Sequence, residues 1–431
     1  MNKVFPVPQA APAPTLPPLD GDTITGRLKE LAACTDVPGE LTRLSLTPAH
    51  KRAAAQVSYW MREAGLTQVH MDATGTIVGR YAADRANAKT LLIGSHIDTV
   101  RNAGIYDGSL GVLTAIAAVE ALHQQGIRLP FAIEVAAFAD EEGVRFLSTL
   151  TSSKAMAGIF DPKSLEDVDG QGISRIEALR SFGAPVDRVA DCRRDPEDML
   201  GYVEVHIEQG PVLEAAGAPL GIVTGIAGAS RGHVRVRGEA GHSGTLPMAM
   251  RHDALAAAAE MILAVEARGR ADKDHLVATV GTLIIAGSAV NVVPGEVQFS
   301  LDVRTLSDDL RQQAVADIRA AVAEIAAKRG VRAVVDIGHE VPAAPCHGPL
   351  KDRMAKVVEG LQLPVVRLPS GAGHDAMVFR GVMPMAMLFV RSENGSHNPR
   401  EYASPADIGM AAEALYAFLM KTAEEMAGET A

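Results

Sequence analysis

Histidine and carboxylate side chains recur at the ends of apolar segments of this chain. His96 ends the run "TLLIGSH", and Glu141 and Glu142 follow the run "FAIEVAAF". His206 lies in "YVEVHIEQG", and His397 follows "PMAMLFV" in the loop "RSENGSHNPREYA". Side chains of these types bind zinc, cobalt, nickel or manganese in proteins. They therefore predict a site for divalent cations, provided that the fold brings the ends of these segments together.

The segment "ADEEG" places three acids side by side at residues 140–142. Like charges this close repel one another, and the repulsion costs stability unless positive charge lies nearby. We interpret a pair of divalent cations as the positive partner of these carboxylates. Asp107, at the start of the helix after His96, is a further candidate. Asp98 lies two residues after His96, so in an extended segment it can face the same way and support the imidazole ring.

The segments that carry these residues alternate between strand and helix patterns. The run at 90–96 is continuously apolar, which is typical of a strand buried on both faces, and the segments 131–138, 202–210 and 384–390 are predicted to be further strands. Residues 110–126 have helical spacing. This order predicts right-handed crossovers and a mostly parallel mixed α/β sheet. Functional residues of such sheets gather at the carboxyl ends of the strands, where the histidines and acids of this chain lie.

The middle of the chain has a different pattern. Its segments are predicted in this order: strand 231–238, helix 252–268, two strands within 275–304, helix 307–329 and strand 331–339. The order βαββαβ is that of a ferredoxin-like domain. We therefore predict such a domain at about 223–340, inserted into a larger domain formed by 25–222 and 341–431.

The composition excludes several classes of protein. The chain has 431 residues and a net charge of −11, which argues against binding to nucleic acid. No segment approaches the ~18 uncharged apolar residues that a membrane helix needs. Its three cysteines, Cys34, Cys192 and Cys346, suggest neither disulfides nor a thiolate zinc site, so a cytoplasmic location is expected. Residues 1–24 contain six prolines and are interpreted as an N-terminal arm.

The chain resembles the hydantoinase/carbamoylase amidases in eight motifs that occur in order: "GSHIDTV", "YDGSLG", "FADEEGVRF", "VEVHIEQGPVLE", "GEAGHSGTLPMAMRHDA", "NVVPGEVQFSLDVR", "SGAGHDA" and "NGSHNP". These amidases belong to a wider group of two-metal aminoacylases and carboxypeptidases with an inserted dimerisation lid. The resemblance covers about residues 25–425. "YDGSLG" and "HIEQGPVLE" resemble the branch that cleaves carbamoyl groups rather than the peptidases.

The resemblance implies a role for each candidate metal ligand. His96 and His206 would bind one divalent ion, Glu142 and His397 would bind the other, and Asp107 would bridge them. The ions would be zinc, or manganese, cobalt or nickel. The inserted domain at 223–340 would be a lid through which two chains form a homodimer.

The resemblance also implies residues for catalysis and substrate binding. Glu141 would be the general base, taking a proton from a water that the metals activate. His242 would donate to the tetrahedral oxyanion, in its own subunit or in the partner, and Arg304 would bind a substrate carboxylate. Further contacts would come from Gln209, Asn291, Gly371, Gly373 and His374. The alternatives are a turn role for His242, a surface charge for Arg304 and a position beside a helix cap for His374.

The function implied is a cytoplasmic two-metal amidohydrolase of nitrogen catabolism. It would cleave the ureido C–N bond of allantoate or an N-carbamoyl-L-amino acid and release ammonia and carbon dioxide. One alternative is an N-acyl-amino-acid deacylase or metallo-exopeptidase with the same metals. Another is a catalytically inactive binding or regulatory module, which would usually lack a ligand or the base, whereas all five ligands and Glu141 are present here.

Overall fold

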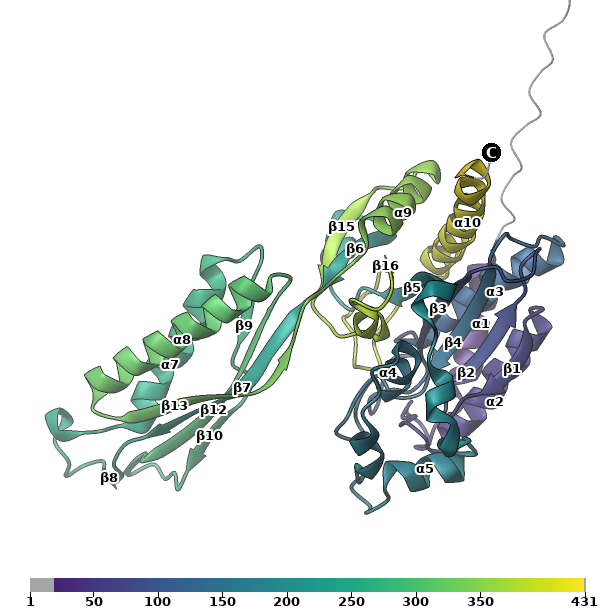
Figure 1. The fold of residues 1–431 in the computed structure, drawn as a ribbon. Helices are drawn as coiled ribbons and strands as arrows, with labels where there is room; N and C mark the ends of the chain where they lie inside the picture. Colours follow the sequence, from purple (N-terminus) through teal and green to yellow (C-terminus); the bar gives the residue numbers. More distant parts are fainter. Residues whose placement is uncertain (1–18, 430–431) are drawn as a thin grey trace, which may run out of the picture. The chain divides into compact units, whose positions relative to one another are not determined.

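The structure, a computed structural model, describes residues 19–429 (Figure 1). This part of the chain divides into two compact units. The first contains the described residues up to Gly221, Asp352–Val366 and those from Leu388 onward. The second contains Ile222–Lys351 and Arg367–Met387.

The first unit is built on a mixed sheet with parallel strands at its centre. Five of its strands lie side by side in this order: β1 (Thr67–Met71), β2 (Ile77–Tyr81), β4 (Ala132–Phe138), β3 (Thr90–His96) and β5 (Met199–Ile207). β3 runs parallel to both β4 and β5, whereas β2 is antiparallel to β4 and β1. Every residue of β3 and β4 is buried, as expected for strands covered on both faces. The predicted mixed α/β sheet is confirmed.

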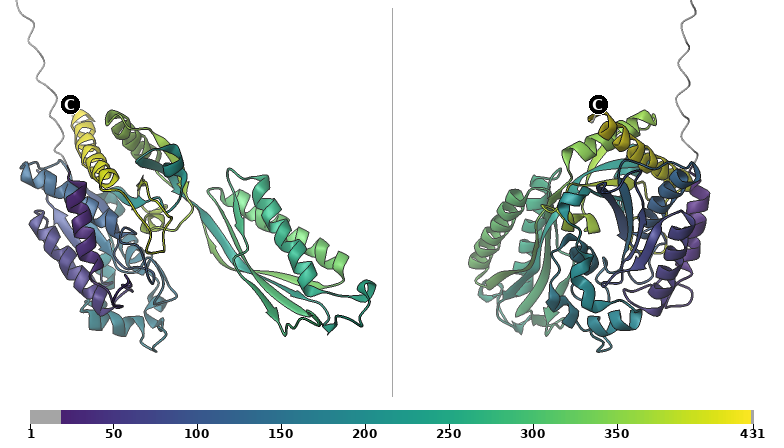
Figure 2. Two further views of the ribbon diagram at one scale, coloured as in Figure 1. Left: turned by 180° about the vertical axis from the view of Figure 1, so that it is seen from behind. Right: turned by 45° about the vertical axis from the view of Figure 1, so that its right-hand side comes forward.

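Helices of the first unit cover the sheet and connect its strands (Figures 1 and 2). They are α1 (Gly21–Ala32), α2 (Pro48–Glu63), α3 (Ser109–Gln124), α4 (Thr151–Ala157), α5 (Arg175–Phe182), α6 (Val212–Ala216) and α10 (Pro405–Glu429). α3 packs against β3, β4 and β5, and α1 and α10 pack against α3 and each other. The short helices between α4 and β5 are η1 (Pro162–Glu166), η2 (Val186–Cys192) and η3 (Pro196–Asp198).

Helix α1 begins four residues inside the predicted N-terminal arm, which was assigned to 1–24. The carboxylate of Asp20 accepts hydrogen bonds from the N–H groups of Asp22 and Thr23 and so caps the helix. The apolar side chains of Ile24, Leu28 and Leu31 are buried on one face of α1. The rest of the predicted arm, residues 1–18, lies outside the described residues.

The second unit contains a five-stranded antiparallel sheet, in which four strands follow the order β10–β12–β7–β13. Its elements are β7 (Gly228–Arg237), α7 (Ala254–Ala271), β9 (Val277–Thr279), β10 (Leu283–Ala286), β12 (Glu296–Thr305), α8 (Asp308–Arg329) and β13 (Arg332–Val341). β9 also pairs with β12. Alternate residues of β12 are buried, and Val297, Phe299 and Leu301 form a core with residues of α7 and α8.

Two features of the second unit differ from the prediction. The strand expected over 275–285 is divided into β9 and β10, because the hydroxyl of Ser300 accepts the N–H groups of Gly281 and Thr282 between them. The unit also takes in residues assigned to the larger domain, since β14 (Ala344–Pro345) and β15 (Val366–Ser370) pair with β6 (Leu220–Ile226). It includes β8 (Gly241–His242), β11 (Val292–Val293), η4 (Met248–Met250) and η5 (Asp375–Phe379). α9 (Gly348–Gly360) and β16 (Met385–Val390) each begin in this unit and end in the first.

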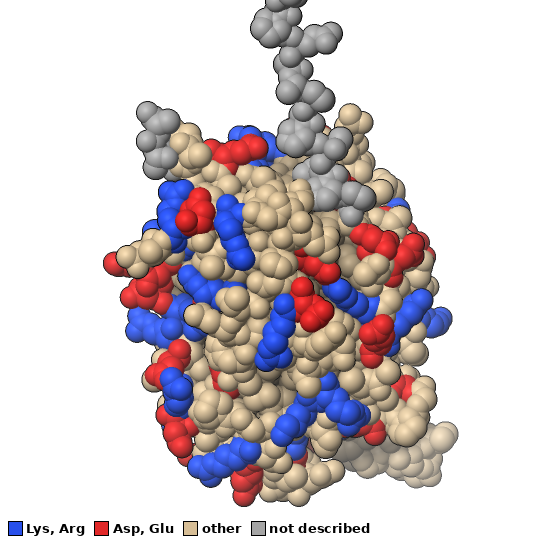
Figure 3. Space-filling model, turned by 90° about the vertical axis from the view of Figure 1, so that its right-hand side faces the viewer, with Lys and Arg blue, Asp and Glu red and all other residues tan. Residues whose placement is uncertain are grey.

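The surface gives no sign of a highly charged patch on the face drawn in Figure 3. Basic and acidic side chains are interspersed over this face, as is usual for a protein that carries both in large numbers. Over residues 19–429, no helix combines the length and the apolar character needed to cross a membrane.

Candidate metal centre

The parallel strands of the first unit bring two of the predicted histidines together. His96 ends β3 and is paired in register with Phe138, the last residue of β4. On its other side, Ile93 is paired with Val203 of β5, and continuing this register places His96 beside His206. The two imidazole rings are buried and their centres are 5.8 Å apart. The prediction that strand ends gather the ligands holds for this pair.

Asp107 lies between two groups of predicted ligands. Its Oδ1 is 3.2 Å from Nε2 of His206 and 3.7 Å from Nε2 of His96. Its Oδ2 is 3.3 Å from Nε2 of His397. The two oxygens of one buried carboxylate therefore face different histidines, which is the arrangement that a carboxylate bridging two cations requires.

Glu142 completes the second group. Its Oε2 is 3.5 Å from Nε2 of His397. Its Oε1 is buried and has no hydrogen-bond partner among residues 19–429. A buried carboxylate oxygen without a partner is costly, and a cation would remove that cost. The ligand atoms of His96, Asp107 and His206 lie within 4.8 Å of one another, as do those of Asp107, Glu142 and His397, so the residues fit two divalent ions.

The shifted pKa values of the candidate ligands show that the buried carboxylates need positive charge nearby. Burial, and then the charge of Asp107, raise the pKa of Glu142 to about 7. Burial alone would raise the pKa of Asp107, yet hydrogen bonds from the histidines hold it well below its usual value. The hydrogen bond to Asp107 also raises the pKa of His397 to about 9. Protons on the histidines and divalent cations are thus competing sources of positive charge here, so metal binding would release protons.

Asp98 has a wider role than the predicted support of His96. Its Oδ1 accepts the N–H of Glu141 at 3.0 Å, and its Oδ2 accepts the N–H of Glu142 at 3.3 Å. Nδ1 of His96 lies 3.0 Å from the backbone oxygen of Asp98 and 3.6 Å from its carboxylate. One residue therefore links a ligand on β3 to the glutamate pair that follows β4.

The prediction that cations neutralise all three adjacent acids is wrong for Asp140. Its carboxylate turns away from the ligands and accepts hydrogen bonds from Thr151 and Ser152 at the start of α4. Nη1 of Arg175 lies 2.7 Å from Asp140 Oδ2. Only Glu142, of these three acids, belongs to the group around Asp107 and His397. The repulsion is thus relieved for Asp140, which turns away and pairs with a buried arginine, whereas ligand atoms of Glu141 and Glu142 lie within 4.8 Å of each other and of His96.

The backbone around Asp107 is unusual. Gly108 has a φ of 64°, and a Cβ atom there would lie 2.5 Å from atoms of the His96 ring. Gln209 and His397 adopt left-handed conformations with φ of 61° and 58°, which are costly for residues other than glycine and occur often at functional sites. Nε2 of Gln209 donates to Asp107 Oδ2 at 2.9 Å. Gln209, predicted to contact substrate, is thus also a residue that orients Asp107.

Two residues that hold Asp107 were not predicted from the sequence. Oε1 of Glu401 accepts the N–H groups of Tyr106 and Asp107 at 3.0 and 3.1 Å. The hydroxyl of Ser396 lies 2.7 Å from Asp107 Oδ2 and also contacts the Glu401 carboxylate. Both lie in "NGSHNPREY" together with His397, and their closeness to a ligand in the sequence was the one available signal.

The predicted substrate contacts of the second unit form two separate groups. β8 pairs with β11, so that His242 lies opposite Val292, and the N–H of Ser243 donates to the carbonyl of Asn291. His242 and Asn291 are both exposed. At the other end of β12, Arg304 donates to the carbonyl of Gly371 at 2.6 Å. The β7–β12 ladder separates the two groups, since Arg237 and Glu296 pair at the end near β8 (Figure 1).

Gly373 and His374, also predicted to bind substrate, closely follow Gly371, whose carbonyl Arg304 contacts. His374 is buried, and its Nε2 lies 2.8 Å from the hydroxyl of Ser370, whereas Gly373 is exposed. Nε and Nη2 of Arg304 bind the carboxylate of Asp302 at 2.9 and 2.8 Å. With Gly371, these contacts use three of the five guanidinium N–H donors, so within the described residues two can still serve a ligand.

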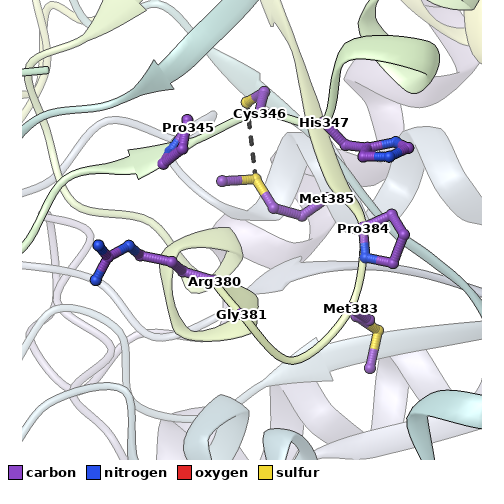
Figure 4. Close-up of a pocket in the computed structure, with 8 residues that line it drawn as sticks. All are labelled: Pro345, Cys346, His347, Arg380, Gly381, Met383, Pro384 and Met385. Atoms are coloured by element: carbon purple, nitrogen blue, oxygen red, sulfur yellow. Dashed lines mark hydrogen bonds between the residues drawn. The ribbon is translucent and has the colours of Figure 1, made fainter.

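A pocket of about 340 Å³ in the second unit is distinct from these groups (Figure 4). Residues of two segments, 345–347 and 380–385, line it. Sγ of Cys346 and Sδ of Met385 lie 3.7 Å apart at its wall, and the ring of His347 points away from them. No residue predicted to bind metal or substrate lines this pocket.

Comparison with known proteins agrees with this geometry. The pattern of Peptidase family M20/M25/M40 matches residues 92–421. N-carbamoyl-L-amino acid amidohydrolase of Geobacillus stearothermophilus is 40% identical over 400 residues, covering 92% of this chain and 97% of the relative. Allantoate deiminase 2 of Glycine max is 40% identical over 429 residues, covering 92% and 89%. The crystal structure of a hydantoinase/carbamoylase amidase from Burkholderia multivorans has a TM-score of 0.88 and 32% identity, covering 93% and 98%.

These matches span most of the chain, which therefore belongs to Peptidase family M20/M25/M40. Within that family, the resemblance to the hydantoinase/carbamoylase amidases is confirmed.

Proposed function

We propose that this hydrolase of family M20/M25/M40 is a two-metal amidohydrolase that cleaves the ureido C–N bond of a ureido acid, allantoate or an N-carbamoyl-L-amino acid. One observation carries the proposal. Asp107 presents its two oxygens to two groups of ligands, and Glu141 adjoins one of these groups through Glu142. The names of the two 40% identical relatives supply the substrate class.

Different residues bind the metal ions and transfer the proton. His96, His206 and Asp107 would hold one divalent ion, and Asp107, Glu142 and His397 would hold the other. Such ions polarise a carbonyl and make a water molecule more acidic. Glu141, whose backbone N–H is fixed by Asp98, takes the proton of the attacking water and passes it to the departing nitrogen. One water is consumed, the carbamoyl group is released as ammonia and carbon dioxide, and the other nitrogen of the ureido group stays on the organic product as an amine.

Ammonia release identifies the substrate. The metal-supplemented chain should release ammonia from at least one of allantoate, an N-carbamoyl-L-amino acid, β-ureidopropionate and ureidoglycolate. The order of kcat/KM values among the four would name the physiological class of ureido acid. Release from none of them would contradict the proposed function.

We also propose that the antiparallel sheet of the second unit, with α7 and α8, is the ferredoxin-like lid and dimerisation domain. Support comes from its strand order, in which β7 and β12 are central and β13 and β10 flank them. In this proposal Arg304 binds the substrate carboxylate with the help of Gly371, Gly373 and His374. His242 and Asn291 stabilise the oxyanion.

The length of the β7–β12 ladder suggests that these two groups serve different active sites. Arg304 lies eight residues along β12 from Glu296, which corresponds to about 26 Å at ~3.3 Å per residue. His242 and Asn291 lie beyond the Glu296 end. A small ureido acid cannot span that distance. We infer that His242 acts on the metals of a partner subunit when Arg304 acts within its own, or the reverse, which makes the homodimer necessary for catalysis.

Mixed dimers test this arrangement. Arg304→Lys and His242→Ala chains should each have low activity as pure dimers, because each lacks one substrate contact. In a mixed dimer one site loses both contacts and the other keeps both. Co-expression of the two variants in equal amounts should therefore restore about one quarter of the wild-type activity, since half of randomly formed dimers are mixed. The measurement is the kcat of the mixed dimers after tag purification, which should be about one half of the wild-type value because one of their two sites is intact.

The control is a mixture of Arg304→Lys with Arg304→Ala, which cannot restore the missing contact. If the mixed Arg304/His242 dimers were no more active than this control, both residues would act in the same site and the trans arrangement would be wrong.

A further inference from the structure

We propose that Arg175 is a positioning residue for the glutamate pair Glu141 and Glu142. Through Asp140 it fixes the loop after β4, so that Glu142 meets its metal and Glu141 meets the attacking water. The inference deepens the proposed function, on which the roles of the two glutamates rest. Arg175 itself lies on α5, outside every predicted group of ligands.

The loop that carries the glutamates has little regular structure of its own. Residues 139–150 join β4 to α4 without forming a helix or strand. Leu147 is 93% exposed, and Gly143 has a left-handed φ of 65°. No hydrogen-bond ladder of a sheet or helix therefore fixes the glutamates, and side-chain contacts must do so.

Asp140 anchors the loop immediately before the pair. Its Oδ1 accepts the N–H and the hydroxyl of Ser152 at 2.9 and 2.5 Å. Its Oδ2 accepts the N–H of Thr151 at 3.0 Å and Nη1 of Arg175 at 2.7 Å. Asp140 is only 4% exposed, so its negative charge depends on these donors. The loop is thereby tied to the first turn of α4.

Arg175 ties the same loop at further points. Its side chain is 2% exposed, and Nη2 donates to the carbonyl of Ser148 at 2.5 Å. Its guanidinium carbon lies 4.6 Å from the centre of the Phe146 ring. Nε donates to the carbonyl of Ser164 in η1 at 3.1 Å. A planar guanidinium can satisfy these separate acceptors at once, whereas the point charge of a lysine cannot.

Asp98 holds the pair from the opposite side by accepting the N–H groups of Glu141 and Glu142. The two residues are thus held between Asp98 on the β3 side and the Asp140–Arg175 pair on the α4 side. Losing one of these supports would let the carboxylates shift, and a shift of about 1 Å at a catalytic group can cost about 10²-fold in rate.

The test compares Arg175→Lys with wild type in metal binding and catalysis. Equilibrium dialysis against Mn²⁺ should show affinity for the more weakly bound ion lowered by about 10- to 100-fold, the usual effect of losing a residue that supports a ligand. Turnover should fall by about 10-fold or more with KM changed by less than about 3-fold, because the residue does not touch substrate. Should Arg175→Lys not fold, Asp140→Asn removes the same ion pair and should give the same pattern.

A matched control separates positioning from general stability. Arg353 on α9 also pairs with a carboxylate, Glu425, and lies near a ring, that of Phe418, but it contacts no residue of the candidate centre. Arg353→Lys should lower the melting temperature without changing Mn²⁺ affinity. If the two lysine variants lost equal affinity at equal loss of melting temperature, Arg175 would be merely structural.

The Glu142→Gln background sharpens the test, because it lacks the ligand that Arg175 is proposed to position. Adding Arg175→Lys should then lower Mn²⁺ affinity no further, and a second large loss would overturn the proposal. The binding data do not depend on the substrate. If wild type released no ammonia from ureido acids, the proposed function would fail, while the affinity comparison would still decide the role of Arg175.

Discussion

Replacing Glu141 with glutamine is expected to lower kcat by about 10²–10⁴-fold, the usual contribution of a general base. Glutamine keeps the size of the side chain but cannot accept the proton of the attacking water. The N–H of residue 141 would still donate to Asp98, so the loop should keep its position. Metal content should be unchanged, because the centre around Asp107 is formed by Glu142 and three histidines.

Glu142→Gln is the matched control, since it changes the neighbouring residue in the same way. This variant should lose affinity for one of the two ions, because Glu142 Oε1 is the buried oxygen without another partner among the described residues. Metal content by mass spectrometry and kcat should be measured on both variants. Wild-type turnover in Glu141→Gln would assign the base to another residue.

Removal of divalent cations is expected to abolish activity completely. Chelation would leave Asp107 and Glu142 buried together with only histidine protons to balance them. Re-adding Mn²⁺, Co²⁺, Ni²⁺ or Zn²⁺ should restore turnover, with the extent differing between metals. The chelated chain should also melt at a lower temperature, because ions that bind only the folded state stabilise it.

The matching control adds Mg²⁺, which prefers oxygen ligands and should restore little activity at a site rich in histidine. Full turnover in exhaustively metal-free protein would show that the clustered histidines and acids do not act through metal.

The parts of the fold that depend on local pattern could be predicted from the sequence. β3 was expected at 90–96 and is Thr90–His96, because a strand covered on both faces must be apolar throughout. The meeting of His96 with His206 followed from parallel strands that end at one edge. Contacts that join distant segments could not be predicted. Arg175 lies 35 residues after its partner Asp140, and nothing in "SRIEALRSF" marks it as a buried arginine.

The same limit applies to the second unit. The motifs around His242 and Arg304 could be found from resemblance, but the distance between them depends on the register of β7 with β12. The boundary of the unit depends on which strands pair with β6, and the pairing of β14 and β15 has no signal in the sequence of either segment. The left-handed backbone conformations of Gln209 and His397 could not be predicted either. Residues other than glycine that adopt this conformation have no reliable sequence pattern.

Whether the metal centre acts on ureido groups is best measured with one amino acid in three forms. N-carbamoyl-L-methionine, N-acetyl-L-methionine and a dipeptide ending in L-methionine present the same carboxylate and side chain to the enzyme. We expect kcat/KM of the metal-loaded wild-type chain to be highest for the carbamoyl form, with ammonia released, and Glu141→Gln to lower this value. A higher kcat/KM for the acetyl form or the dipeptide would contradict the proposed function and make the chain a deacylase or peptidase.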